Sequence, residues 1–363
     1  MKNKIKNIII TFLFFGIIIV LFFINIIKKD EEISISERRK IEQFPQITAS
    51  KIFDGTASNK FEKYTMDQFI EREFFRKLKI DIEFKLFGKK DYNNLYEYGG
   101  YIISQNYPLN EKSIVNITKK IKNIKEQYLT DENEIYYTIV PDKNYFVNNG
   151  NLKIDYNRLE EIMKENLNFA EYINIKDNLE LEDYYKTDTH WKQEKLIKIA
   201  KVISDSMNLN IEDTEYNEEN IGEFKGVYSG QLPIVQESDN LKILRNNILN
   251  NCIVYNYENE KTTDVYDMSK KSSMDKYDIY LSGAVSLIRI DNPENKNGKE
   301  LIVFRDSYAS SLIPLLVSSY SKVTLVDTRY ISPKILNQYI DFTNQDVLFI
   351  YSTLVINNSS SLK

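Results

Sequence analysis

The N-terminal segment constrains the fold most, because it holds an uninterrupted apolar run. The stretch "IIITFLFFGIIIVLFFINII" (Ile8–Ile27) contains no charged side chain. A helix of that length is roughly 30 Å long, which matches the hydrocarbon core of a bilayer. A buried helix of a globular domain would show a polar stripe, and none interrupts this run. The sequence therefore predicts a transmembrane helix over residues 8–27.

The flanks of this run indicate how it is used. Three lysines in residues 1–7 favour a cytoplasmic N-terminus, although Lys28 and Lys29 weaken that bias. A cleaved signal peptide has a shorter apolar region and a small-residue cleavage site, which this sequence lacks. We therefore expect an uncleaved signal anchor that crosses the cell membrane once, with the C-terminal domain extracellular.

The part of the chain after the anchor is acidic. The sequence has 48 basic and 53 acidic residues, and five lysines lie within the first 29 positions, which leaves a formal charge of −10 for the remainder. Nucleic acid binding rests on Lys and Arg that neutralise phosphates, so we expect no nucleic acid partner. Cys252 is the only cysteine, so we expect neither an internal disulfide nor a metal or other cofactor.

Residues 28–60 are polar without a sustained period and suggest a stalk. The next stretch, "YTMDQFIEREFFRKLKIDIEFKLFG" (64–88), predicts one long amphipathic helix packed against a core. Its apolar residues recur every four positions: Met66, Ile70, Phe74, Leu78 and Ile82. We expect a single extracellular domain over residues 61–355, with a β-leaning insertion at about 209–300.

Strand-like and helix-like stretches alternate through this domain. A buried strand is expected over Ile135–Val140, and three more in "ELIVFRDSYASSLIPLL", "KVTLVDTRY" and "DVLFIYS". Helical periodicity is seen over residues 109–129, 156–169 and 191–209. This alternation predicts an α/β fold, a parallel sheet with helices on both faces.

One predicted strand ends next to a serine. Ligands of open α/β sheets bind beyond the carboxyl ends of the strands, and Ser307 follows the strand in "ELIVFRDSYASSL". The backbone N–H groups of Ser307 and Tyr308 would point outward and could stabilise an oxyanion. Alternatively, Ser307 or Asp306 merely caps the following helix.

The stretch "YYKTDTHW" (184–191) holds the only histidine and the only tryptophan of the chain. A serine nucleophile needs a base, and the base needs an orienting group. In an extended loop, Asp188 and His190 would project to the same side, with one ring nitrogen free for Ser307. The alternative is a solvated histidine beside a carboxylate that caps a helix.

Together, "YKTDTHW" and "VFRDSYASSLIPLL" resemble the DHHW proteins, relatives of the alginate O-acetyltransferases in the SGNH-hydrolase superfamily. Further similar blocks are "FIEREFFRKLKIDIEFKLFG", "YGGYII", "IVPDKNYF" and "LVDTRYI" with "DVLFIYS", so the resemblance spans roughly residues 60–355. It implies an SGNH-like, flavodoxin-like sheet in which Asp and His precede Ser along the chain. It also implies that Ser307 is the nucleophile, His190 the general base and Asp188 its orienting carboxylate.

Two positions depart from the family pattern. Thr189 stands where the family has a second histidine, and Arg305 stands where the superfamily has a glycine. The Asp-x-His spacing survives the first change. The second leaves open the shape of the turn and of its oxyanion hole.

Weaker candidates surround these residues. Lys143 and Arg329 follow predicted strands, where they would hold an anionic group of a substrate, or they are surface charges. Tyr184, Tyr185 and Trp191 would stack on sugar rings, or they pack in the interior. Aromatic residues beside a helix start more often pack in the interior, and Tyr185 and Trp191 are the candidates for stacking.

These features lead to two hypotheses. The first is a membrane-anchored extracellular serine O-acetyltransferase or acetylesterase that acts on a cell-surface polysaccharide. Because acetyl donors are cytoplasmic, the resemblance implies a membrane-bound O-acyltransferase as the partner that delivers acetyl groups. The second is a non-catalytic protein with a degenerate SGNH fold that binds or assembles a cell-surface polysaccharide, which the departures at Thr189 and Arg305 favour.

Overall fold

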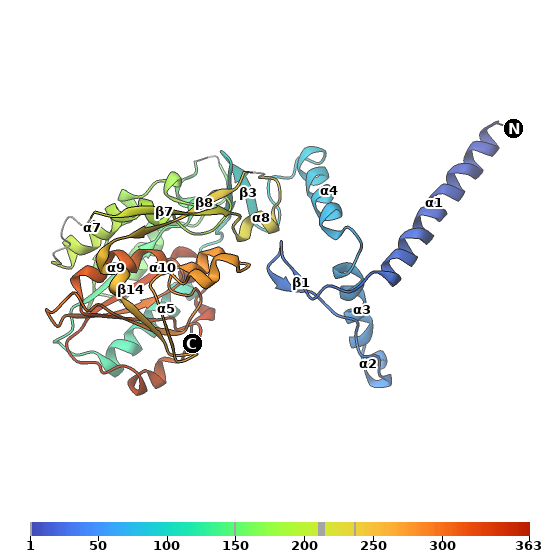
Figure 1. Cartoon of the computed structure of the whole chain (residues 1–363). Helices are drawn as coiled ribbons and strands as arrows, with labels where there is room; N and C mark the ends of the chain where they lie inside the picture. The colour runs from blue at the N-terminus through green and yellow to red at the C-terminus, as the bar shows by residue number, and fades with distance from the viewer. Residues whose placement is uncertain (1, 149, 210–214, 236) are drawn as a thin grey trace. The chain divides into compact units, whose positions relative to one another are not determined.

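The structure is a computed structural model that describes residues 2–148, 150–209, 215–235 and 237–363. Its contacts divide the chain into two units (Figure 1). The N-terminal unit comprises residues up to 92 together with 230–234, and the large unit comprises 93–229 and 235–363. We expected residues 61–92 to belong to the large domain, whereas the contacts group them with the N-terminal helix.

The N-terminal unit is mainly helical. Its elements are α1 (Lys2–Ile27), β1 (Ile33–Ser34), β2 (Arg39–Lys40), α2 (Ala49–Phe53), α3 (Thr56–Asp67) and α4 (Arg72–Lys85). Residues Lys4–Ile27 of α1 form a helix that is long and apolar enough to cross a membrane. Such a helix near an N-terminus serves either as a membrane anchor or as a signal sequence.

The prediction of a single helix over residues 64–88 is wrong, because the helix is interrupted between α3 and α4. The side chain of Gln68 accepts a hydrogen bond from the Glu31 N–H and donates to the carbonyls of Glu31 and Glu42. Glu71 adopts a left-handed backbone conformation with φ of 51°, which a continuous helix cannot contain. The Gln68 side chain thus ties this point of the chain to the segment around β1 and β2, and the Ile70 N–H donates to the Asn25 side chain instead of to a helical carbonyl.

The predicted packing of this stretch is wrong as well. Ile80 is the only buried residue of α4, and Phe74, Leu78 and Ile82 of the four-residue repeat are exposed. The apolar stripe therefore faces away from the core of its own unit.

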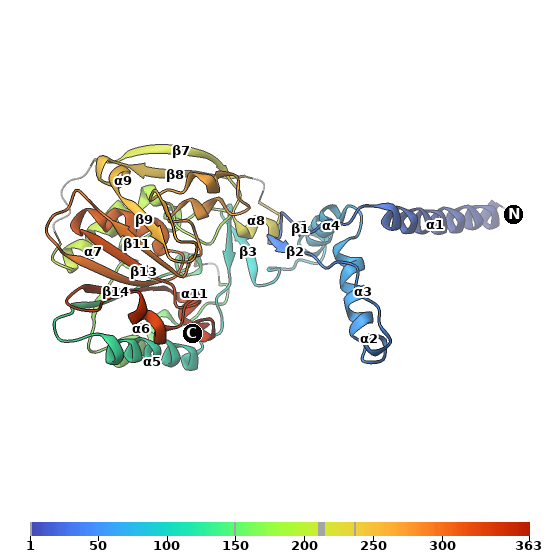
Figure 2. The same ribbon diagram turned by 60° about the horizontal axis from the view of Figure 1, so that its bottom comes forward.

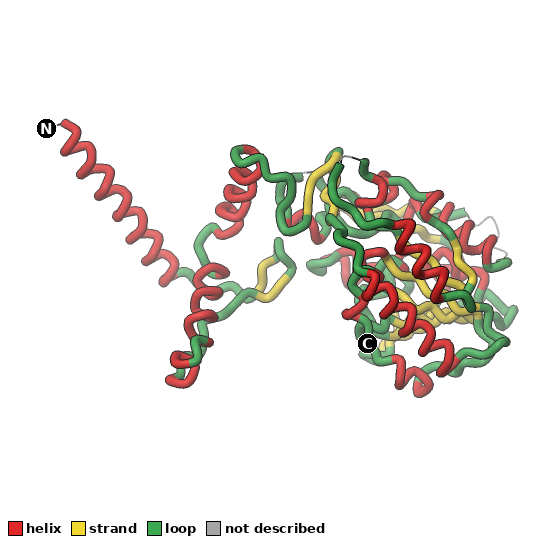
Figure 3. Tube along the Cα trace, turned by 180° about the vertical axis from the view of Figure 1, so that it is seen from behind, coloured by secondary structure: helices red, strands yellow, loops and turns green. Residues whose placement is uncertain are grey.

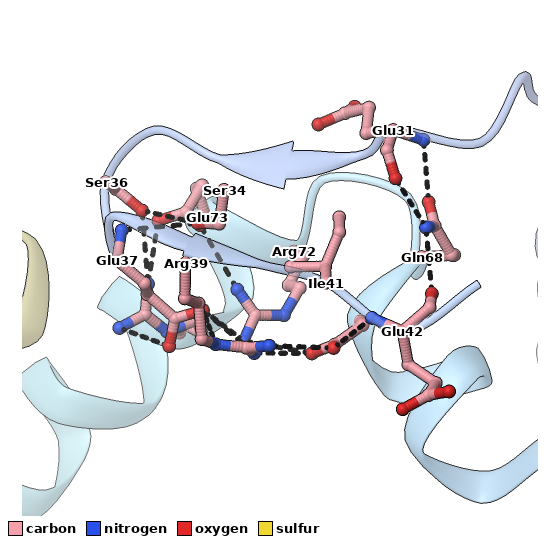
Figure 4. A network of polar contacts seen from close by, with 12 residues as sticks. Glu31, Ser34, Ser36, Glu37, Arg39, Ile41, Glu42, Gln68, Arg72 and Glu73 are labelled. Carbon is pink, nitrogen blue, oxygen red and sulfur yellow. Dashed lines mark hydrogen bonds and ion pairs between the residues drawn. The ribbon is translucent and has the colours of Figure 1, made fainter. Parts of the chain in front are cut away.

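Ion pairs hold the β1–β2 hairpin to the helices of this unit (Figure 4). Arg39 of β2 pairs with Asp67 of α3 at 2.5 Å, and Arg72 of α4 pairs with Glu37 at 2.8 Å. Glu37 also lies 3.4 Å from Arg76. Exposed ion pairs contribute little singly, but a network with shared partners fixes geometry better than isolated pairs do.

The large unit is built on a sheet that has eight strands in the described residues (Figures 2 and 3). The strands are β5 (Ile135–Val140), β6 (Glu171–Ile173), β9 (Ile253–Asn256), β10 (Lys261–Thr263), β11 (Leu287–Asp291), β12 (Glu300–Arg305), β13 (Lys322–Val326) and β14 (Asp346–Ser352). Their order is β10-β9-β11-β13-β12-β14-β5-β6. The strands from β13 to β6 run parallel, and β11, β9 and β10 extend one edge in antiparallel pairs.

The order of the parallel strands accounts for the order of the candidate residues along the chain. Counted from β12 as the first strand, then β13, β14, β5 and β6, the spatial order is the flavodoxin-like 2-1-3-4-5. In chain order, however, β5 and β6 come first. The fold therefore corresponds to a circular permutation of that order. The segment after β6, which contains residues 184–191, thus precedes the strand β12 that leads to Ser307.

Apolar side chains alternate between the two faces of the sheet. In β12, Leu301 and Val303 belong to one core cluster and Ile302 and Phe304 to the other. The second cluster is covered by α5 (Glu111–Tyr128) and α6 (Tyr156–Asn166), and the first by α7 (Ile197–Ser206) (Figure 2). The α/β fold with helices on both faces is confirmed. The helix expected over 191–209 begins only at Ile197, after a 3₁₀ turn at Gln193–Lys195.

Several shorter elements complete the large unit. They are the hairpin β3 (Leu95–Tyr98) and β4 (Tyr101–Ser104), the pair β7 (Asn217–Phe224) and β8 (Asp239–Arg245), and the short helices α9 (Asn247–Asn251), α10 (Ala309–Leu312) and α11 (Thr353–Ile356). The helix α8 (Val227–Gln231) follows β7 in the chain, and its residues 230–231 belong to the N-terminal unit. Gly99 and Gly100 both have positive φ, which the tight β3–β4 turn requires. The region 209–300 is rich in strands, as expected, although residues 210–214 lie outside the described residues. Three of its strands, β9 to β11, join the main sheet.

Candidate active site

Three predicted residues meet beyond the carboxyl end of β12. The Oγ of Ser307 lies 2.8 Å from Nε2 of His190, and Nδ1 of the same ring lies 2.6 Å from Oδ1 of Asp188. Ser307 is half-buried, in the turn between Arg305, the last residue of β12, and α10. The structure thus aligns a hydroxyl, an imidazole and a carboxylate in one hydrogen-bonded chain.

The loop that carries Asp188 and His190 is folded back on itself, not extended as we expected. Tyr184 and Trp191 form an antiparallel bridge, and the Tyr185 N–H donates to the His190 carbonyl at 3.0 Å. The His190 N–H donates to Oδ1 of Asp188 at 3.0 Å. This is the local bond by which Asp accepts from the backbone two residues on. The two side chains therefore meet because of a turn and not because of strand-like alternation.

Asp239 at the start of β8 anchors this loop. Its carboxylate accepts hydrogen bonds from the backbone N–H groups of Lys186 and Thr187, at 2.8 Å each, and from the Thr187 hydroxyl at 2.7 Å. The same hydroxyl accepts from the N–H of Gly226 at 2.8 Å. A buried carboxylate with several donors holds the loop in one conformation.

Gly226 lets the backbone approach the Asp188 side chain closely. A Cβ on residue 226 would lie 2.2 Å from Cβ of Asp188, which no real pair of carbon atoms tolerates. Because of this close approach, the next amide, that of Val227, donates to Oδ2 of Asp188 at 2.8 Å. The second carboxylate oxygen of Asp188 thereby has a backbone donor of its own.

The His190 ring is enclosed by aromatic side chains. Tyr277 stacks on it with ring centroids 3.8 Å apart and an interplanar angle of 8°, and Tyr308 lies at 5.0 Å. The Tyr277 hydroxyl bonds Oγ of Ser311 at 2.7 Å, which fixes the stacked ring. The imidazole therefore cannot rotate away from Asp188 and Ser307 without disturbing Tyr277.

The charge of Asp188 sets the tautomer of His190. Burial alone would raise the pKa of the Asp188 carboxyl, but the His190 ring and the N–H groups of His190 and Val227 outweigh it and hold the pKa below its usual range. The ionised carboxylate of Asp188 accepts a hydrogen bond from the N–H at Nδ1 of His190. This leaves Nε2 as the acceptor for the Ser307 hydroxyl, the arrangement that a general base needs.

The expected oxyanion role of Tyr308 is wrong. Its N–H donates to Oδ1 of Asp306 at 3.0 Å, and Oδ2 of Asp306 accepts from the Ser352 N–H at 2.7 Å. Asp306 therefore ties the turn to the end of β14. Within the described residues, the Ser307 N–H donates no hydrogen bond, so it stays available to a ligand.

The two departures from the family pattern have structural partners. Thr189 and Tyr308 are joined twice, through their hydroxyls at 3.1 Å and through the Tyr308 hydroxyl and the Thr189 carbonyl at 2.7 Å. Arg305 is fully buried and donates to Oγ of Ser310 at 2.9 Å and to the carbonyls of Gly283 and Val285. Both residues brace the segments that carry His190 and Ser307.

Lys143 is neither a surface charge nor placed to hold a substrate group. It is buried, and its ammonium group donates to the carbonyls of Tyr185 and Lys186 at 3.0 and 3.4 Å. Burial lowers the pKa of Lys143 to about 7. This side chain supports the loop from within the interior.

The aromatic residues that flank His190 do not present faces to a sugar either. Tyr184, Tyr185 and Trp191 are all fully buried. The indole N–H of Trp191 donates to the Tyr308 carbonyl and to Oγ of Ser311, both at 3.0 Å. The alternative of interior packing is therefore correct for all three, and stacking by Tyr185 and Trp191 is wrong.

Among the predicted substrate-binding residues, Arg329 alone has a side chain that is partly exposed to solvent. It follows β13 and pairs with Asp327 through two contacts, at 2.9 and 2.6 Å. Burial alone would lower the pKa of Arg329, but the bonds with Asp327 raise it. One fifth of its side chain (20 %) is exposed.

Sequence reasoning missed the supporting residues Asp239, Gly226 and Tyr277. They come from the region 209–300, and no motif links them to the loop. In the described parts of the chain, no three His, Cys, Asp or Glu side chains gather as a metal site.

A protein-family model matches the part of the chain that carries the candidate site. Residues 164–326 match the family model of the DHHW protein family, a stretch that contains Asp188, His190 and Ser307. No curated protein matches the chain.

Solved structures match 71–75 % of the chain. A DHHW family protein from Eubacterium siraeum has a TM-score of 0.62 and is 19 % identical, with 75 % of this chain and 94 % of that chain covered. Bacillus cereus PatB1 with a sulfonyl adduct has a TM-score of 0.55 and is 17 % identical, with 72 % and 97 % covered. The O-acetyltransferase domain of Pseudomonas putida AlgJ is 12 % identical at a TM-score of 0.45, with 71 % and 90 % covered. The resemblance predicted from the sequence is confirmed: this chain is similar to the DHHW proteins in sequence over residues 164–326 and in its fold.

Proposed function

We propose that this protein is a membrane-anchored extracellular serine O-acetyltransferase or acetylesterase that acts on a cell-surface polysaccharide. The observation that carries the proposal is the chain of hydrogen bonds from Ser307 through His190 to Asp188, at 2.8 and 2.6 Å. A buried, ionised carboxylate behind a fixed imidazole is what activation of a serine hydroxyl requires.

The geometry supports a two-step reaction. In the first step, Oγ of Ser307 attacks the carbonyl carbon of an acetyl ester while Nε2 of His190 takes the hydroxyl proton. The tetrahedral intermediate collapses as the alcohol leaves with that proton, and an acetyl-serine remains. In the second step, His190 takes a proton from a sugar hydroxyl or from water, and that oxygen attacks the acetyl carbon. The bond between this carbon and Oγ of Ser307 then breaks, and His190 returns the proton to Oγ, so that the free serine is restored. A sugar acceptor makes the protein a transferase, and water makes it an esterase.

Asp188 holds the ring in the productive tautomer throughout. When His190 carries the transferred proton, the imidazolium lies between Ser307 and the negative Asp188, which stabilises it. The oxyanion of each tetrahedral intermediate would accept from the Ser307 N–H, with Arg329 as a candidate for an anionic group elsewhere on the substrate.

The apolar N-terminal helix supports the proposed location. The apolar helix Lys4–Ile27 is suited to an uncleaved anchor, with residues 1–7 cytoplasmic. An extracellular transferase needs acetyl groups from a cytoplasmic donor, so the proposal includes a membrane-bound O-acyltransferase as the partner. The relative Bacillus cereus PatB1 was solved with a sulfonyl adduct, and sulfonyl groups, like phosphonates, are electrophiles toward activated hydroxyls.

The test is covalent labelling of the full chain with a serine-directed fluorophosphonate, followed by mass spectrometry of the peptide that contains Ser307. We expect labelling at Ser307 in the wild type, none in Ser307→Ala, and strongly slowed labelling in His190→Ala. Ser321→Ala is the matched control, because Ser321 lies outside the site and its hydroxyl donates to the Lys299 carbonyl, and it should keep the labelling at Ser307.

A non-catalytic binding protein is the second candidate, and one observation favours it. The Tyr308 N–H is already bonded to Asp306, so the site has fewer oxyanion donors than expected. No labelling at Ser307, together with no turnover of acetyl esters, would support this candidate over the enzyme.

A further inference from the structure

The outward face of α4 carries large apolar side chains. Phe74, Leu78, Ile82 and Leu86 follow one another at intervals of four and are 59, 41, 39 and 73 % exposed. Ile80 points to the opposite side and is fully buried. A helix on the surface of a soluble protein turns its apolar stripe toward the core, so α4 presents the stripe to something other than its own unit.

Hydrogen bonds place the start of α4 beside the end of the membrane helix. The N–H of Ile70, two residues before α4, donates to Oδ1 of Asn25 in the last turn of α1 at 2.8 Å. The Tyr64 hydroxyl donates to Asp30 at 3.0 Å, and the Glu31 N–H donates to Gln68 at 3.0 Å. If α1 spans the bilayer, α4 begins where α1 leaves it.

The segment around α4 is also basic. Residues 72–90 contain seven basic and three acidic side chains, in a chain whose net charge is −5. Ion pairs of Lys85 with Asp81, of Lys89 with Glu83 and of Arg72 and Arg76 with Glu37 offset part of this charge, and a positive excess remains. Each Lys or Arg near an anionic bilayer contributes about 1 kcal/mol of attraction.

We propose that α4 is an interfacial helix that lies in the outer surface of an anionic membrane, with Phe74, Leu78, Ile82 and Leu86 inserted at the boundary between headgroups and acyl chains. Apolar side chains on one face with lysines beside them are typical of such helices. The inference rests on the anchor of the proposed function and adds a second attachment of the N-terminal unit to the bilayer. It does not depend on the chemistry at Ser307.

A lipid surface fits these observations better than a second copy of the chain. Two copies packed through this face would bring their positive segments together, which costs free energy. The covalent continuity with α1 and the bond between Ile70 and Asn25 favour lipid, because they hold the face at the membrane exit.

The test uses the full chain in vesicles of phosphatidylglycerol and phosphatidylcholine. Cys252, the only native cysteine, is replaced by serine, so that a bimane fluorophore reacts only with an introduced cysteine. Leu78→Cys places the probe on the apolar face, and Lys77→Cys is the matched control one position away on the helix. Phe14→Cys places a probe within α1.

Nitroxide lipids then report which probes contact the bilayer. We expect a headgroup-level nitroxide to quench most of the Leu78→Cys emission and little of the Lys77→Cys emission, while a nitroxide deep in the acyl chains quenches Phe14→Cys. Equal quenching of the two α4 probes would overturn the inference. A blue-shifted but unquenched Leu78→Cys probe would also overturn it, because protein would then cover the face. An unquenched Phe14→Cys probe would overturn both the anchor and the inference.

Discussion

The loop of residues 184–191 and the helix α4 differ in whether their side chains are held by contacts within their own unit. In the loop, Asp188 receives three hydrogen bonds, His190 is stacked on Tyr277, and Trp191 is buried. On α4, the large apolar side chains of one face are exposed. The loop is thus determined by contacts within the large unit. The outward face of α4 needs a partner from outside its unit, and we propose the membrane as that partner.

The largest expected effect concerns the two carboxylates that hold the loop. Asp188→Asn removes the charge that fixes the His190 tautomer, so we expect a loss of up to about 10⁴-fold in acetyl ester turnover. The matched control Asp239→Asn changes a carboxylate whose hydrogen bonds, within the described residues, go to the loop backbone and Thr187. We expect it to keep most of the activity and to destabilise the fold by about 1–3 kcal/mol. Equal losses of activity in both variants would mean that Asp188 acts only by holding the loop.

The next largest effect is the difference in stability between substitutions on the two faces of α4. Ile80→Ala removes a buried side chain and should cost about 2–5 kcal/mol, whereas Leu78→Ala on the exposed face should stay within about 0.5 kcal/mol in detergent. Hydrogen exchange of the peptide that spans α4, measured by mass spectrometry, reports both values. A large cost for Leu78→Ala in detergent would show that this face packs against protein.

The smallest effect is a pH dependence caused by Lys143 beneath the loop. Because burial lowers the pKa of Lys143 to about 7, the unfolded chain, with a lysine pKa of about 10.4, binds more protons above pH 7. This lysine should therefore make the fold more stable as the pH rises from about 7 to 9.5, by at most about 1.4 kcal/mol per pH unit.

The measurement is urea unfolding at both pH values, followed by the fluorescence of Trp191, the sole tryptophan. Cys252 acts in the opposite direction, because burial raises its thiol pKa to about 12. The relevant quantity is therefore the difference between the wild type and Lys143→Met. A difference that does not change with pH would contradict the assigned shift.

The sequence predicted which residues form the candidate site, but it did not predict how they are arranged. Ser307, His190 and Asp188 were found because a turn after a buried strand and an Asp-x-His spacing are local patterns. The fold-back of the loop, the occupied N–H of Tyr308 and the burial of Lys143 depend on segments far along the chain, which local patterns cannot reveal. On α4, the four-residue repeat correctly marked a stripe, but a repeat does not specify which surface covers it.

The central claim is that Ser307 and His190 act as one chemical unit. The most direct measurement is turnover of a small acetyl ester by the full-length wild type, Ser307→Ala, His190→Ala and the double variant. His190 is the only histidine, so no other imidazole can replace it. We predict that each single variant loses about 10⁴-fold or more and that the double variant is scarcely worse, since residues of one catalytic unit are not additive. A wild type that is active while His190→Ala keeps most of that activity would contradict the account.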